Sequence, residues 1–176
     1  MCEDLMQDNV IVNKNGGAIA NRNGTAIEES LIPFFQRLNF RIFFEKDIKK
    51  NPLLLNNLDK YILRDVKYKS IYGSNRCKTE YLIVDKERRV RVEMKFQVSA
   101  GSVDEKYPYM LLNAIEAYPE KEIIFVVDGG GYKIGALNWL REHIDNNWLN
   151  YKEKGKDIKL MNIGEFNTYF IKEFCN

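Results

Sequence analysis

Charged and polar side chains alternate with apolar ones along the stretch VRVEMKFQ, residues 90–97. This alternation predicts a β-strand with two different faces. Glu93 and Lys95 occupy alternate positions, so they share one face of the strand. A carboxylate beside an ammonium group can hold a divalent cation and stabilise charge on a phosphate. The alternative is a solvated face whose ion pairs are nearly neutral in energy.

A second predicted strand precedes this one, and the two are joined by the charged turn KERR. This turn places Asp85 opposite Val90. Glu80 then lies opposite Lys95, on the face that also carries Glu93, whereas the acid next to the turn points to the other face. Neighbouring carboxylates repel each other unless a hard cation lies between them, and Mg²⁺ accepts such oxygen ligands. Glu80 and Glu93 are therefore candidate metal ligands.

The other elements follow from the spacing of apolar residues. Helices are predicted at 25–38, 53–63, 103–118, 132–149 and 164–174, and strands at 40–46, 79–85, 90–97, 122–128 and 157–162. Pro33 lies inside the first helix, where a proline can kink or break it. An antiparallel pair followed by alternating helices and strands indicates an α/β fold, with a central mixed sheet flanked by helices on both faces.

Length and composition fit one soluble globular domain. The chain has 176 residues, of which 45% are hydrophobic and 30% are charged. Residues 1–23 are rich in Asn and Gly and are expected to form a flexible N-terminal arm, which leaves residues 24–176 as a single domain. No apolar run is long enough to span a membrane, and the N-terminus lacks the pattern of a signal peptide. A cytoplasmic protein without membrane partners is expected.

Other facts of composition limit the chemistry that the chain can perform. The chain holds one histidine, His143, so a zinc site with several histidines cannot be built. Its three cysteines are odd in number and lack metal-ligand spacing, which is typical of free thiols. A net charge of +2 is too small to identify a nucleic-acid partner by itself.

The glycine run in VVDGGGYKIGA follows a predicted strand and opens a predicted helix. It has neither the Lys-Ser/Thr pair of a phosphate loop nor the spacing of a dinucleotide fingerprint. A nucleotide-binding protein built around Gly129–Gly131 and a tight turn between strand and helix are both open interpretations, and the pattern favours the turn.

Five segments, taken in order along residues 24–149, carry a family resemblance: GTAIEESL, TEYLIV, VEMKFQ, SAGSVDEKYPY and IIFVVDGGGYKIGALNWL. With them the chain resembles the PD-(D/E)XK nuclease superfamily, to which many type II restriction endonucleases belong. In that superfamily a helix with a glutamate precedes a hairpin that carries one acid and then an acid-x-Lys triplet. The matching positions are Glu28 for the helix, Glu80 for the first acid, Glu93 and Lys95 for the triplet, and Gln97 where some relatives place a glutamine close to the metal.

The match departs from the superfamily pattern at two positions. The first acid is a glutamate where an aspartate is usual, and Thr79 stands in place of the proline that gives the family its name. Asp85 therefore remains an alternative for the first acid, although the face of the hairpin favours Glu80.

The resemblance implies a Mg²⁺-dependent DNA endonuclease with a restriction-endonuclease-like core, in which Mn²⁺ can substitute for Mg²⁺. The three matching glutamates would hold the metal, the helix glutamate would position water on it, and Lys95 would orient the water that attacks phosphorus and leaves a 5′-phosphate. Cutting both strands of a duplex needs two such sites, which implies a homodimer. A restriction enzyme would also have a companion DNA methyltransferase. The alternative is a non-catalytic DNA-binding or assembly module on the same fold.

In a nuclease, three further segments are placed to contact DNA. Ser99, Ser102 and Lys106 follow the candidate strand closely enough for phosphate or base contacts, and Lys133 comes next to the glycines. The alternative for the serines is an ordinary loop in which Ser102 caps the next helix. The basic, tyrosine-containing segment 67–78 is either a loop that enters a groove or a solvated connection.

Overall fold

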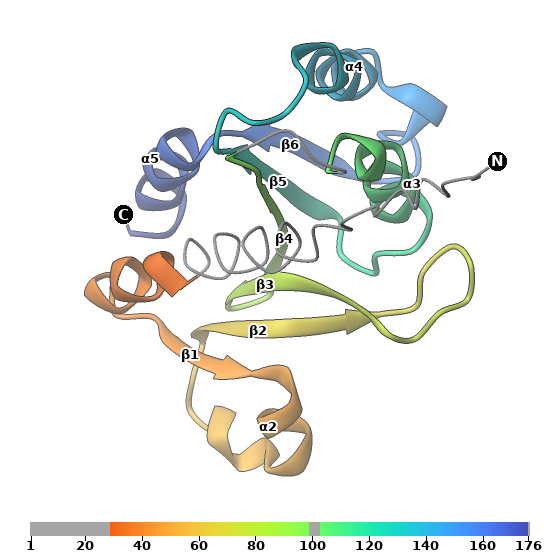
Figure 1. Cartoon of the computed structure of the whole chain (residues 1–176). Helices are drawn as coiled ribbons and strands as arrows, with labels where there is room; N and C mark the ends of the chain where they lie inside the picture. The colour runs from red at the N-terminus through yellow and green to blue at the C-terminus, as the bar shows by residue number, and fades with distance from the viewer. Residues whose placement is uncertain (1–28, 99–102, 176) are drawn as a thin grey trace, which may run out of the picture.

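The computed structural model describes residues 29–98 and 103–175, and Figure 1 shows one central sheet with helices against both faces. The described residues form six strands: β1 Arg41–Phe44, β2 Lys60–Tyr68, β3 Cys77–Asp85, β4 Arg88–Phe96, β5 Glu122–Asp128 and β6 Asp157–Met161. The strands lie side by side in chain order. β1 is parallel to β2, β2 to β4 are antiparallel, and β4 to β6 are parallel. The predicted mixed sheet between helices is confirmed.

Helices cover the two faces of this sheet (Figure 1). The helix at residues 29–37 packs on one face with α5 Ile163–Phe174, and α3 Tyr107–Glu116 packs on the other with α4 Ile134–Asp145. The described residues also form four short helices: α2 Glu45–Lys50, η1 Pro52–Leu55, η2 Asp104–Lys106 and η3 Trp148–Asn150. Residues 29–37 stay helical through Pro33. Among the described helices, none is long and apolar enough to cross a membrane.

Buried side chains from the helices fill the core on each side of the sheet. On the α5 side, Phe35 and Phe170 are fully buried, and the ring of Phe35 lies 5.4 Å from that of Tyr81 in β3. On the other side, Leu111 of α3 and Leu140 of α4 are buried against β5 and β6. Because both faces of β5 are covered, its sequence EIIFVVD is apolar without alternation, as predicted.

The prediction of a helix at residues 53–63 is wrong. Only Pro52–Leu55 is helical, as a 3-10 turn, and β2 begins at Lys60. Asn57 has φ of 61°, a left-handed conformation that does not continue a right-handed helix. β2 then pairs with a neighbour on each side, and this pairing outweighs the helical spacing of the leucines. The short helix α2, which follows β1 directly, was also not predicted.

The turn between β3 and β4 is shorter than predicted. Asp85 lies opposite Arg88 and not opposite Val90. The turn consists of Lys86 and Glu87, and Lys86 has φ of 54°, a conformation that two-residue hairpin turns use. The predicted register is therefore wrong by two residues. Since side chains alternate with a period of two, this even shift leaves each side chain on its predicted face.

Candidate active site

The structure brings three of the predicted residues together on the sheet face that packs against α3. Lys95 Nζ lies 2.5 Å from Glu93 Oε1 and 3.8 Å from Glu80 Oε1. It also donates a hydrogen bond of 2.9 Å to the backbone carbonyl of Met94. The side chains of Lys95, Glu80 and Glu93 are 18%, 16% and 8% exposed, so the cluster is mostly shielded from water. Glu28, the other predicted acid, lies outside the described residues.

The cluster lies where β3 and β4 separate, a point that we call the fork. The paired positions of these strands end with Tyr81 opposite Val92. Two residues further along β4, the backbone N–H of Met94 donates to Oε2 of Glu80 at 2.7 Å. A side-chain carboxylate thus serves as the hydrogen-bond acceptor that a backbone carbonyl provides elsewhere in the ladder. This bond fixes the carboxylate of Glu80 beside Lys95.

Asp85, the alternative first acid, lies away from this cluster. It stands at the end of β3 opposite Arg88, next to the hairpin turn. The alternation of side chains along β3 puts Asp85 on the face opposite to that of Glu80. The geometry accordingly favours Glu80 as the first acid.

The charge of Lys95 is set by its two acidic neighbours. Burial by itself lowers the pKa of the Lys95 ammonium, but the carboxylates of Glu93 and Glu80 raise it by more, so the pKa lies above its usual value. Lys95 is therefore a cation that balances two carboxylates. Such an ammonium group can orient a water molecule or neutralise charge on a phosphate.

The oxygen atoms around Lys95 form a donor set that suits a hard cation. They are the carboxylates of Glu80 and Glu93 and the carbonyl oxygen of Met94. Mg²⁺ prefers oxygen ligands and commonly takes only one or two carboxylates, with water and substrate phosphate as the other ligands. The described residues contain no group of three or more His, Cys, Asp or Glu side chains that could hold a metal ion. Among the described residues, a metal ion at the fork would therefore have two acidic ligands.

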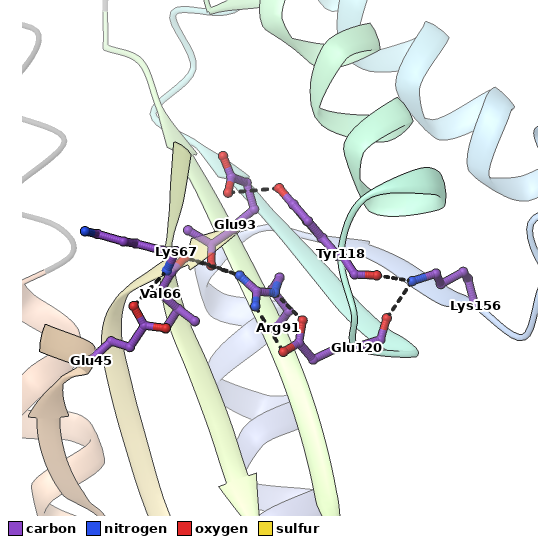
Figure 2. A network of polar contacts seen from close by, with 9 residues as sticks. Glu45, Val66, Lys67, Arg91, Glu93, Tyr118, Glu120 and Lys156 are labelled. Carbon is purple, nitrogen blue, oxygen red and sulfur yellow. Dashed lines mark hydrogen bonds and ion pairs between the residues drawn. The ribbon is translucent and has the colours of Figure 1, made fainter. Parts of the chain in front are cut away.

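A buried network holds the second oxygen of Glu93 (Figure 2). The hydroxyl of Tyr118 donates to Glu93 Oε2 at 3.3 Å, whereas Lys95 contacts Oε1. Burial and the nearby carboxylate of Glu93 raise the pKa of Tyr118, so its hydroxyl stays protonated and remains a donor. Because the two oxygen atoms of Glu93 have different partners, the orientation of this carboxylate is fixed.

Next to Tyr118 lies a buried ion pair between Arg91 and Glu120. Arg91 is 1% exposed, and its guanidinium contacts both carboxylate oxygens of Glu120, one of them at 3.0 Å. The guanidinium also donates to Thr79 Oγ1 at 2.9 Å, and its carbon lies 5.1 Å from the centre of the Tyr118 ring. That distance is within the range of a cation–π contact. The ion pair thus joins β4 to residues 117–121, the connection between α3 and β5.

Lys156, in the segment before β6, also fixes this connection, residues 117–121. Lys156 Nζ donates to the backbone carbonyl oxygens of Tyr118 and Glu120. The sequence analysis did not predict this network, although a charged residue at position 91 of a buried strand indicates that a partner is needed. A charged residue on a strand face that helices cover needs a buried partner. The sequence does not reveal that the partner is Glu120.

Gln97 uses both polar groups of its amide to join two loops. Its Nε2 donates to the carbonyl of Gly131 at 2.9 Å, and its Oε1 accepts from the backbone N–H of Val103 at 3.1 Å. The side chain thereby connects the end of β4 to the segments that lead into α3 and α4. A contact of Gln97 with a metal or its water stays a prediction.

The glycine run packs against the backbone of Gln97. Gly129 has φ of 103°, and a Cβ atom built on it would lie 2.5 Å from the carbonyl oxygen of Gln97. The N–H of Gly131 donates to the same oxygen at 2.7 Å. These contacts explain why glycine is found in this turn. With a side chain at Gly129, the turn could not approach β4 so closely. They favour the tight turn over a nucleotide-binding loop.

Gly129→Ala is expected to reduce the free energy of unfolding by at least about 2 kcal/mol, since it combines a strained φ with a backbone clash. Gly130→Ala is the matched control. Gly130 also has a positive φ, of 72°, but apart from its chain neighbours nothing lies within 4 Å of the position of its Cβ. Urea denaturation of both variants measures the difference. Equal losses would mean that the close approach at Gly129 contributes nothing.

The residues predicted to contact DNA are only partly described. Ser99 and Ser102 lie outside the described residues. Lys106 and Lys133 are exposed, at the end of η2 and directly before α4. Their segments touch, because the backbone N–H of Lys133 donates to both carboxylate oxygens of Asp104 at 3.2 Å. The two lysines thus stand on neighbouring segments, and their contact with DNA stays a prediction.

Comparison with known families assigns the chain to one class of protein. A model of the PD-(D/E)XK nuclease superfamily domain matches residues 19–174. Since the match covers most of the chain, this protein belongs to the PD-(D/E)XK nuclease superfamily. No significant match was found among curated proteins or among solved structures.

Proposed function

We propose that this protein is a Mg²⁺-dependent DNA endonuclease that hydrolyses phosphodiester bonds, and specifically a restriction endonuclease that cuts double-stranded DNA. Mn²⁺ is expected to substitute for Mg²⁺. The observation that carries the proposal is the convergence of oxygen atoms from Glu80, Glu93 and Met94 on the ammonium group of Lys95. Membership of the superfamily supports the same reaction.

Each residue of the cluster has a distinct part in this proposal. A bound magnesium ion would supply positive charge at the phosphate and lower the pKa of a water molecule. The carboxylates of Glu80 and Glu93 would bind it at the fork. Lys95 would orient the water for in-line attack on phosphorus and offset the charge that develops there, so that the product carries a 5′-phosphate. Glu28 and Gln97 are proposed to complete the surroundings of the metal.

The proposed partners follow from the substrate. Hydrolysis of both strands of a duplex needs two active sites, so a homodimer is proposed. A companion DNA methyltransferase would protect the host's own DNA, and both proteins would act in the cytoplasm. Ser99, Ser102, Lys106 and Lys133 are proposed to contact the DNA backbone or bases.

Incubation of the purified protein with plasmid and phage DNA tests the proposal, with Mg²⁺, with Mn²⁺ and with EDTA. Discrete fragments that depend on the metal are expected. A smear would indicate a nuclease without sequence specificity and would remove the restriction function. Binding without cleavage in either metal would contradict the nuclease proposal and favour a non-catalytic DNA-binding or assembly module.

Glu80→Gln is expected to eliminate metal-dependent cleavage, and Asp85→Asn is expected to leave it within about twofold of the wild type. The reason is that Glu80 lies at the fork beside Lys95, whereas Asp85 lies at the hairpin turn. Both changes remove one negative charge and keep the size of the side chain. Cleavage rates on one plasmid substrate give the comparison, with circular dichroism as a check of folding. The reverse result would identify Asp85 as the first acid.

A further inference from the structure

The connection between β2 and β3 holds an aromatic side chain out into solvent. Tyr72 is 80% exposed, more than any other large hydrophobic residue that the structure describes. Its ring stacks on that of Tyr109 of α3, with centroids 5.2 Å apart and planes inclined by 20°. Tyr109 thus covers one face of the Tyr72 ring, and the other face is open. An open aromatic face is a surface on which a planar group can stack.

Hydrogen bonds hold this connection in one conformation. Ile71 N–H donates to Oδ1 of Asn113, a fully buried residue of α3, at 3.0 Å. The turn itself is closed by bonds from Gly73 N to the carbonyl of Ser70 at 2.7 Å and from Ser70 N to the carbonyl of Ser74 at 2.9 Å. Tyr72 therefore stands on a fixed support. A fixed aromatic ring loses little conformational entropy when a ligand stacks on it.

The charged side chains of the hairpin segment around Tyr72, residues 66–79, are all basic. The exposed ones lie on both sides of Tyr72 in the chain: Lys67, Lys69, Arg76 and Lys78. Residues 66–79 contain no Asp or Glu. Lys78 pairs with Asp65 at 2.8 Å, which is the one ion pair formed by the described side chains of residues 66–79. Basic side chains around an aromatic ring are the combination that binds a single strand of nucleic acid.

The hairpin leads directly into the candidate active site. β3 runs from Cys77 at the hairpin to Glu80 at the fork, a rise of about 10 Å. This equals roughly three nucleotides along a strand of B-form DNA. At the other strand of the hairpin, the ring of Tyr68 lies 4.6 Å from that of Tyr118, which contacts Glu93. Tyr72 lies in the loop beyond Cys77, so a strand whose phosphate lies at the fork would extend at least about three nucleotides to reach it.

We propose that Tyr72 stacks on an unpaired base of the DNA strand that enters the active site, while the basic side chains of residues 67–78 bind its phosphates. This inference rests on the proposed nuclease function and names the class of substrate. In a continuous duplex the bases stack on one another and offer no free face. Double-stranded DNA with an unpaired section or end about three or more nucleotides from the phosphate that is cut is then expected to bind more tightly than a continuous duplex.

Fluorescence anisotropy tests the inference without requiring cleavage. The probes are a labelled single strand, a blunt duplex and a duplex with a short single-stranded end, each in Ca²⁺ and in EDTA. Tyr72→Ala is expected to weaken binding of the single strand and of the overhang by about tenfold, and binding of the blunt duplex by less than about twofold. Tyr72→Phe, which keeps the ring, is expected to bind like the wild type.

Leu53→Ala is the matched control, because Leu53 is also a highly exposed apolar residue, 70% exposed, on a segment away from the hairpin. It should leave all three affinities unchanged. Arg76→Ala and Lys69→Ala are expected to weaken binding of all three probes and to reduce the slope of log Kd against log salt by about one each. Quenching of 2-aminopurine in the single strand, lost in Tyr72→Ala and kept in Tyr72→Phe, reports stacking directly.

The outcomes separate this inference from the nuclease proposal. Equal binding of wild type and Tyr72→Ala to the single strand overturns the stacking role, whether or not the protein cleaves DNA. A wild type that binds no single strand overturns it as well. Ring-dependent binding of the single strand without cleavage in Mg²⁺ or Mn²⁺ supports the stacking role and contradicts the nuclease.

Discussion

Lys95→Ala is expected to reduce the rate of DNA cleavage by about 10²–10³-fold, with little change in DNA affinity. The ammonium of Lys95 contacts Glu93 and lies near Glu80, so its charge acts where a phosphate and a metal would meet. Because Lys95 lies at the edge of the core, its replacement by alanine should remove little packing. Single-turnover cleavage in Mg²⁺ measures the chemical step, and anisotropy in Ca²⁺ measures binding.

Two further variants test whether the expected loss of cleavage is specific to the ammonium group of Lys95. Lys95→Arg keeps a positive charge but replaces a compact ammonium by a planar fork, so only partial recovery of the rate is expected. Lys154→Ala is the control, because Lys154 pairs with Glu116 on the surface, where both side chains are over two-fifths exposed. It should cleave like the wild type. Cleavage by Lys95→Ala at a rate near that of the control would remove Lys95 from the mechanism.

Glu120→Ala is expected to lower the free energy of unfolding by about 3–5 kcal/mol, because it leaves a buried guanidinium without its partner. Arg91 is 1% exposed and cannot turn to solvent without opening the core. Urea denaturation gives the change in stability. Glu116→Ala is the matched control, since it removes the same group from a surface ion pair, and its loss should stay under about 1 kcal/mol.

A double variant separates the loss of the ion pair from the burial of a lone charge. Arg91→Met combined with Glu120→Leu removes both charges and keeps apolar volume, so it should recover most of the stability lost in Glu120→Ala. Such a protein still lacks the cation beside the Tyr118 ring. If Glu120→Ala proves no less stable than Glu116→Ala, the Arg91–Glu120 pair does not hold the connection at residues 117–121 as the structure indicates.

The sequence predicted those strands and helices in which the spacing of apolar residues is clear. The strand at 122–128 was predicted with its observed bounds, because a run buried on both faces leaves no alternation to misread. β2 was missed, because residues 53–63 contain leucines at helical spacing and the strand forms by pairing with β1 and β3. Pairing of that kind depends on segments distant in the chain, which local periodicity does not report.

The candidate site was predicted more completely than the network behind it. Glu80, Glu93 and Lys95 share a face by strand alternation alone, so the wrong turn length did not separate them. The contact between Tyr118 and Glu93 has no such rule. It depends on where the chain after α3 passes β4, and no short-range pattern in the sequence specifies that position.

The Arg91–Glu120 pair also constrains how this chain can change over evolutionary time. Neither residue can be exchanged alone without leaving a buried charge, and an intermediate that loses several kcal/mol falls below the stability that most proteins retain. The two positions are therefore expected to be inherited together and to be replaced only as a pair. Because Tyr118 stands next to this pair and contacts Glu93, a lineage that repacks residues 117–121 must at the same time rebuild the support of its acidic cluster.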